Sequence, residues 1–299
     1  MRNSNKTSTG TNLSNTAALT QADPPDSSVV IIEPPKRFAA LNLGDLWLYR
    51  ELIYFMTWRD LKVRYKQTVL GVLWAVIKPF MTMVVFSIFF GGLAKVPSDG
   101  VPYPIFAFTA LLPWELFVTA LQQASRSLVV NSNMITKVYF PRIILPISSI
   151  LGGVVDFFIA FLVLIAMMVY YGLKPTANVW ALPLFLLLAF ITALGVGLWL
   201  SALNVLYRDI GYITPFLTQF WLFITPIVYP ASMVPEKWKL LYAINPMTGV
   251  VEGFRWALLG TQASAPSNML LISSLIAVAL LISGMFYFRR MERTFADMV

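Results

Sequence analysis

From residue 69 onward the chain alternates between long apolar stretches and short polar connections. Six apolar stretches are long enough, at about 1.5 Å of rise per helical residue, to cross the roughly 30 Å hydrocarbon core of a bilayer. They lie at residues 69–90, 104–124, 143–170, 179–206, 212–229 and 269–288. The pattern predicts an all-α integral membrane protein with six transmembrane helices.

The segment just before the first span, residues 43–66, has a different pattern. When it is drawn as a helix, its aromatic and apolar residues fall on one stripe with basic residues on both flanks. The stripe consists of Trp47, Tyr54, Trp58, Leu61 and Tyr65. Such a helix is predicted to lie in the membrane interface, with its basic side chains reaching toward phosphates.

Two of the connections also contain helical patterns. Residues 125–142 carry Leu128, Val129 and Met134 at helical spacing before Pro141, which favours a short cytoplasmic helix over a solvated connector. Residues 230–260 form two apolar pieces broken at Asn245-Pro246, each too short to span. We expect this pair to enter the external side of the membrane and return, although a seventh span is the alternative.

Composition supports the membrane assignment, because 58% of the 299 residues are hydrophobic and only 12% are charged. Residues 1–35 are rich in Ser, Thr, Asn and Pro and lack the apolar run of a signal peptide. They are predicted to be a disordered cytoplasmic tail preceding a membrane domain at 36–299.

The net charge of +8 is best explained by topology rather than by nucleic-acid binding. From Arg50 onward, twelve Lys and Arg residues fall on the side of the predicted interface helix, and five fall on the opposite side. The positive-inside rule therefore predicts that both termini are cytoplasmic.

The candidate chemistry inside the membrane is sparse. The absence of Cys and His argues against zinc sites, thiol chemistry and Ser–His nucleophiles. The ionisable residues within the predicted spans are Lys78, Glu115 and Asp156, and two interpretations remain open: Lys78 pairs with one of the acids, or the acids form a proton relay. The Asp residues are too scattered to suggest the metal site of a polyprenyl transferase. No phosphate-binding loop is present, so ATP would have to be hydrolysed by a separate subunit.

Aromatic residues recur at helical spacing in the second and fifth predicted spans. Most such residues would face lipid or the core, but a subset lining a pathway would offer flat apolar faces to sugar rings. The candidates for this channel role are Trp114, Phe117, Phe216, Phe220, Trp221 and Tyr229.

Five ordered blocks resemble the transmembrane subunit of ABC-2 type polysaccharide exporters, the type V exporter family that includes O-antigen, teichoic-acid and group 2 capsule permeases. The blocks are RDLKVRYKQTVLGVLWAVIKPF at 59–80, LLPWELF at 111–117, KVYFPRIILP at 137–146, LNVLYRDIGYITPFLTQFWLFITPIVYP at 203–230 and YAINPMTGVVEGFRWALLG at 242–260. The resemblance covers roughly residues 40–295. The tail at 1–35 is unlike the short amino termini of that family.

The resemblance implies a homodimeric permease in the cell inner membrane that forms a channel with its second copy. Two copies of an ABC ATPase would bind from the cytoplasm and hold the ATP and Mg, leaving this chain without a cofactor or an enzyme site. The cargo would be a polysaccharide linked to undecaprenyl diphosphate. The nearest alternative is an ABC-2 permease for a small hydrophobic drug or lipid, followed by a proton-coupled transporter.

The resemblance also implies roles for particular residues. Contact with the ATPase is expected at Arg59, Asp60, Asn131, Asn133, Met134 and Lys137. Basic residues placed to meet a lipid diphosphate are Arg59, Lys62, Arg64 and Lys66, although orienting the protein in the membrane is an equally good role for them. The external gate is expected to include Trp238, Tyr242, Pro246, Phe254 and Trp256.

Overall fold

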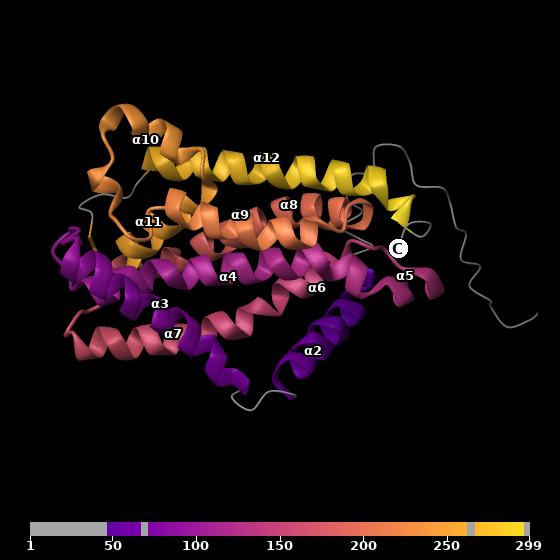
Figure 1. The fold of residues 1–299 in the computed structure, drawn as a ribbon, viewed down its shortest axis with the longest axis horizontal. Helices are drawn as coiled ribbons and strands as arrows, with labels where there is room; N and C mark the ends of the chain where they lie inside the picture. The colour runs from indigo at the N-terminus through magenta and orange to yellow at the C-terminus, as the bar shows by residue number, and fades with distance from the viewer. Residues whose placement is uncertain (1–46, 67–70, 262–266, 296–299) are drawn as a thin grey trace, which may run out of the picture. The chain divides into compact units, whose positions relative to one another are not determined.

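The computed structural model describes residues 47–66, 71–261 and 267–295, all of which fall in one compact unit, Ala40–Val299. The predicted tail at 1–35 and the start of the predicted interface helix lie outside the described residues. The described part of the chain is helical and contains no strand (Figure 1). The elements are α2 (Arg50–Lys66), η1 (Gly71–Leu73), α3 (Trp74–Phe86), η2 (Ser87–Leu93), α4 (Tyr103–Val130), α5 (Ser132–Lys137), α6 (Ile144–Leu151), α7 (Gly153–Tyr170), η3 (Ala177–Ala181), α8 (Leu182–Leu206), α9 (Ile210–Ile224), η4 (Ala231–Met233), α10 (Glu236–Ala243), α11 (Pro246–Leu259) and α12 (Ser267–Glu292).

The predicted all-α membrane fold is confirmed. Within the described ranges, five helical segments are long and apolar enough to cross a membrane. They are Gly71–Leu93, Tyr103–Val130, Ile144–Tyr170, Ala177–Leu206 and Asn268–Glu292. Each overlaps one of the six predicted spans, and the remaining predicted span, 212–229, corresponds to the shorter helix α9.

Helix α9 ends earlier than the apolar pattern predicted because of a proline. Pro226 disfavours helical geometry at the residue before it, and Thr225 is extended, with φ −86° and ψ 140°. The 15 residues of α9 cover about 22 Å, less than the roughly 30 Å of hydrocarbon. A crossing at this place therefore needs the non-helical residues 225–230 as well.

Helix α4 is the centre of the bundle. It packs against α8, α9 and α11 on one side and against α3, α6 and α7 on the other (Figure 1). It is also the most buried of the five long segments, because other helices pack on it from both sides. The main hydrophobic core surrounds this helix, and α12 packs on the outer side of α8.

A second hydrophobic core lies at the end of the bundle where α2, α5 and α12 meet. It joins Met56 of α2, Ile135 of α5 and Phe288 of α12, with Met134 packed against its edge. This core fixes the positions of α2 and α5 and thereby builds the candidate site described next.

The segment predicted to break at Asn245-Pro246 contains the two helices α10 and α11. The side chain of Asn245 accepts a hydrogen bond from the Met247 amide at 3.0 Å, and Pro246 occupies the first turn of α11. The two residues together start a new helix in a new direction.

Candidate functional site

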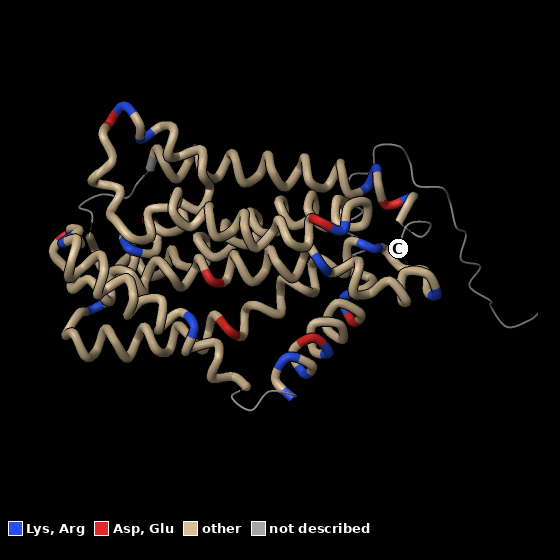
Figure 2. Tube along the Cα trace, viewed as in Figure 1, with Lys and Arg blue, Asp and Glu red and all other residues tan. Residues whose placement is uncertain are grey.

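Charged residues gather at the two ends of the helix bundle and along α2, while the middle of the bundle carries few (Figure 2). Such a distribution suits a protein whose middle lies in hydrocarbon. The end that holds α2, α5 and the last turn of α12 carries the larger number of the predicted site residues.

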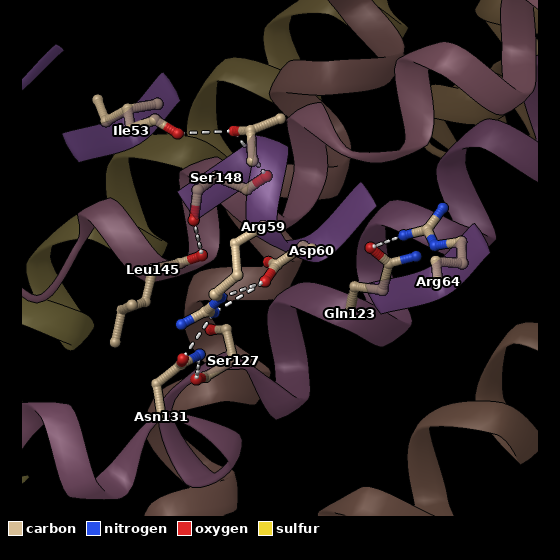
Figure 3. A network of polar contacts seen from close by, with 10 residues as sticks. Ile53, Arg59, Asp60, Arg64, Gln123, Ser127, Asn131, Leu145 and Ser148 are labelled. Carbon is tan, nitrogen blue, oxygen red and sulfur yellow. Dashed lines mark hydrogen bonds and ion pairs between the residues drawn. The ribbon is translucent and has the colours of Figure 1, made fainter. Parts of the chain in front are cut away.

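Helices α2 and α5 are joined by polar contacts that we call the α2–α5 junction, made by Arg59, Asp60, Ser127 and Asn131 (Figure 3). Arg59 Nη2 donates to Asn131 Oδ1 at 2.8 Å and to Asp60 Oδ1 at 2.7 Å. The Asn131 amide donates in turn to the Ser127 carbonyl of α4 at 2.8 Å. A displacement of α5 would therefore be transmitted to α2 through the hydrogen bond between Asn131 and Arg59.

Asn131 is well placed for this role because it lies between two helices. It follows the last residue of α4 and precedes the first residue of α5, and its backbone carbonyl accepts the amides of Met134 at 2.9 Å and Ile135 at 3.1 Å. The residue is buried. One residue thus links three helices, contacting α2 and α4 through its side chain and α5 through its backbone carbonyl.

A second set of contacts, the α2–α7 contact, ties the end of α2 to the bundle through Arg64, Tyr65, Gln123 and Asp156. Arg64 Nη1 lies 2.5 Å from Asp156 Oδ2, and Arg64 Nη2 lies 2.5 Å from Gln123 Oε1. The Tyr65 hydroxyl donates to the other carboxylate oxygen of Asp156. Burial, reinforced by this hydrogen bond, raises the pKa of Tyr65 above its usual range, so the hydroxyl remains a donor.

Lys78 pairs with Glu115 at 2.7 Å, which agrees with the interpretation that Lys78 neutralises one of the two acids. The other acid, Asp156, is neutralised by Arg64, a pairing that the sequence did not reveal. Both ion pairs border one cavity of about 210 Å³ between α3, α4 and α7. Each of the three charged residues that the sequence placed within predicted spans therefore has a partner of opposite sign.

The other residues expected to contact the ATPase lie on α5. Asn133 and Lys137 are exposed, whereas Met134 is half-buried against the second core. Among the four basic residues expected near a lipid diphosphate, Arg59 and Arg64 point into the contacts just described. Lys62 and Lys66 are exposed, and the Lys62 ammonium lies 5.3 Å from the Trp58 ring centroid.

The six candidate channel aromatics do not lie together. Trp114 and Phe117 are fully buried in the main core, where Phe117 packs edge-on against Trp221 at 5.1 Å, so neither has surface to offer a pathway in this arrangement. Phe216 and Phe220 are exposed on α9. Tyr229 packs against Tyr242 of α10, with ring centroids 6.3 Å apart.

The expected gate residues divide in the same way. Trp238 and Tyr242 of α10 border a cavity of about 480 Å³. Pro246 and Phe254 of α11 are buried, and the Phe254 ring packs against Phe157 and Phe185. Trp256 is partly buried and meets Phe185 edge-on, so α11 belongs to the core and α10 to the surface.

Comparison with known proteins identifies the family. The model of the ABC-2 type transporter family matches residues 51–259, which include the α2–α5 junction and both α10 and α11. The chain belongs to the ABC-2 type transporter family. Its resemblance to that family, seen in the five sequence blocks, is thereby confirmed.

Several ABC-2 relatives match along nearly their whole length. The chain is 28% identical over 259 residues, 86% of this chain and 97% of the relative, to the O-antigen export system permease protein RfbA of Klebsiella pneumoniae. It is 28% identical over 258 residues, 85% and 98%, to the protein of the same name from Myxococcus xanthus. The polysialic acid transport protein KpsM of Escherichia coli is 22% identical over 239 residues, 78% and 91%.

Proposed function

We propose that this chain is the membrane permease of an ATP-driven exporter that carries a polysaccharide linked to undecaprenyl diphosphate across the inner membrane. The names of the relatives favour an O-antigen-like polysaccharide. The absence of a phosphate-binding loop from the sequence favours ATP hydrolysis by a separate subunit. A second copy of the chain would complete the channel.

The observation that carries the proposal is the α2–α5 junction. Helix α5 exposes Asn133 and Lys137 at one end of the bundle, and Asn131 at its start is hydrogen-bonded to Arg59 of the interface helix. A cytoplasmic ATPase pair that closes against α5 would move α2 with it. Because α2 is also tied to α7 by Arg64 and Asp156, that movement would reach the membrane-spanning helices.

The lipid diphosphate would first meet Lys62 and Lys66, which are the two exposed members of the basic set on α2. Arg59 and Arg64 already bind protein oxygens, so their role would be to hold α2 in place. Two mobile ammonium groups near the membrane surface suit a transient contact with a diphosphate. The excess of basic residues at this end also supports cytoplasmic termini.

The test is reconstitution with the ABC ATPase subunit that pairs with this chain, sought first among the neighbouring genes. We expect the two proteins to copurify, and we expect the ATPase rate in proteoliposomes to rise with an undecaprenyl-diphosphate-linked glycan but not with undecaprenyl phosphate alone. Stimulation by small hydrophobic drugs without any response to the glycan would instead favour the drug or lipid permease. Transport driven by a proton gradient would contradict both.

A further inference from the structure

The backbone carbonyls of the non-helical residues 225–230 after α9 need hydrogen-bond donors from elsewhere in the chain. The sequence predicts that residues 212–229 cross the membrane, and α9 covers only about 22 Å of a roughly 30 Å hydrocarbon core, so we expect part of this segment to lie at membrane depth. Backbone carbonyls there have no water to bind and must be satisfied by the protein itself. We propose that Arg255 of α11, paired with Glu252, is the positioning residue that donates these hydrogen bonds and holds segment 225–230 against α11. We call this pair and its hydrogen bonds to the segment the lock.

Four successive carbonyls of the segment accept hydrogen bonds from side chains. Arg255 Nη1 donates to the Pro226 carbonyl at 2.6 Å and more weakly to the Tyr229 carbonyl at 3.4 Å. Its Nη2 donates to the Ile227 carbonyl at 2.7 Å. The carbonyl between them, that of Val228, accepts from the Tyr103 hydroxyl of α4 at 2.7 Å. The planar guanidinium fork thus substitutes for the helical hydrogen bonds that end at Pro226.

The charge of Arg255 is neutralised inside the protein. Its Nη1 lies 3.0 Å from Glu252 Oε1, and both side chains are only 1% exposed. The guanidinium also lies over the Phe106 ring, 3.5 Å from its centroid. The carboxylate of Glu252 is hydrogen-bonded in turn by the backbone of Ala231, just past the segment. Both Arg255 and Glu252 are therefore hydrogen-bonded to the backbone of residues 226–231.

The position of the lock suggests what it does. Val228 and Tyr229, within the locked segment, border the cavity of about 480 Å³ together with Trp238 and Tyr242 of α10. Because α11 holds the segment by its backbone, α11 and this wall of the cavity move as one body. The assignment of this cavity to the external end of a glycan pathway rests on the proposed function. The hydrogen bonds that form the lock do not depend on that function.

The chain contains no cysteine, so a single reporter cysteine can be introduced without other changes. Ile227, whose side chain is fully buried, is replaced with cysteine in the full-length protein in nanodiscs, and its reaction with N-ethylmaleimide, a small uncharged maleimide that enters lipid as well as water, is timed. The lock is opened by combining Arg255→Met with Glu252→Gln. Both charges are removed together because a lone buried charge would destabilise the whole fold.

A matched reporter at Ala202, which is fully buried in the second core at the other end of the bundle, monitors the global fold. We expect the labelling rate at Ile227→Cys to rise at least tenfold in the double variant while Ala202→Cys stays protected. Protection at both positions would overturn the proposal, and so would labelling at both, because the pair would then support the entire fold rather than this segment. The assay contains no ATPase and no glycan, so its result does not depend on the proposed function.

Discussion

The guanidinium of Arg59 on α2 donates a hydrogen bond to the side-chain oxygen of Asn131, 2.8 Å away, at the point where α4 ends and α5 begins. These residues are 72 positions apart in the sequence. The bond links α2 to the start of the short helix α5.

Replacing Asn131 with alanine removes the acceptor for Arg59, whereas Asn131→Asp keeps that acceptor and loses only the side-chain hydrogen bond to the Ser127 carbonyl. A hydrogen bond of this partly exposed kind contributes about 0.5–1.5 kcal/mol. We expect Asn131→Ala to lower the stimulation of the partner ATPase roughly threefold to tenfold, while Asn131→Asp retains most of it. Equal stimulation by both variants and the wild type would show that the bond plays no part in coupling.

The α2–α7 contact predicts a defect in stability rather than in proton coupling. Asp156→Ala leaves Arg64 and Tyr65 facing a partly buried gap, so we expect the free energy of unfolding to fall by about 1–3 kcal/mol, and by less for Asp156→Asn. The matched control is Glu236→Gln, because Glu236 is a highly exposed partner of Lys239 and should change stability by less than about 0.5 kcal/mol.

Thermal unfolding in detergent measures this series. If Asp156→Asn folded with normal stability but its transport lost a dependence on the proton gradient, the acid would be part of a relay and the structural interpretation would be wrong.

The buried and exposed aromatics predict two different phenotypes. Phe117 is fully buried between Trp114 and Trp221, so Phe117→Ala should destabilise the fold by about 3–5 kcal/mol. Phe216→Ala, on the exposed face of α9, should leave stability nearly unchanged and, if this face lines the pathway, should reduce glycan export. Melting temperature and export measured on both variants separate the roles. A stable Phe117→Ala protein with impaired export would instead support the prediction that Phe117 lines the channel.

A close helix contact predicts a position that tolerates no side chain. A Cβ placed on Gly195 of α8 would lie 2.6 Å from the backbone nitrogen of Leu281 in α12. A backbone atom cannot relieve this clash by a change of side-chain rotamer. We expect Gly195→Ala to cost about 1–3 kcal/mol despite the better helix propensity of alanine. At Gly92 the nearest atom is 3.7 Å away, so Gly92→Ala should be close to neutral. Equal melting temperatures for the two variants would contradict the close packing of α8 on α12.

The features that local pattern encodes were predictable from the sequence. Runs of apolar residues gave five of the long helices, and Asn245-Pro246 marked the break between α10 and α11. The early end of α9 also had a local signal in Thr225-Pro226, but the apolar run continuing past it obscured that signal.

The polar contacts were not predictable in the same way. Arg64 and Asp156 are separated by 92 positions, and nothing in the pattern around either residue specifies the other as its partner. Helical periodicity identifies the face on which a side chain lies, but the packing of whole helices decides what it meets. The same holds for Arg255, which stood among expected gate helices without any hint that it would bind the carbonyls after α9.

In the proposed function this chain is a passive permease, and a separate ATPase subunit supplies the energy for transport. The most direct test of this function is the translocation of an undecaprenyl-diphosphate-linked glycan into proteoliposomes that contain the purified chain, with and without its ATPase subunit. We predict translocation only when the ATPase and ATP are both present, and none from the chain alone under a proton gradient. Glycan transport by the chain alone would contradict the account.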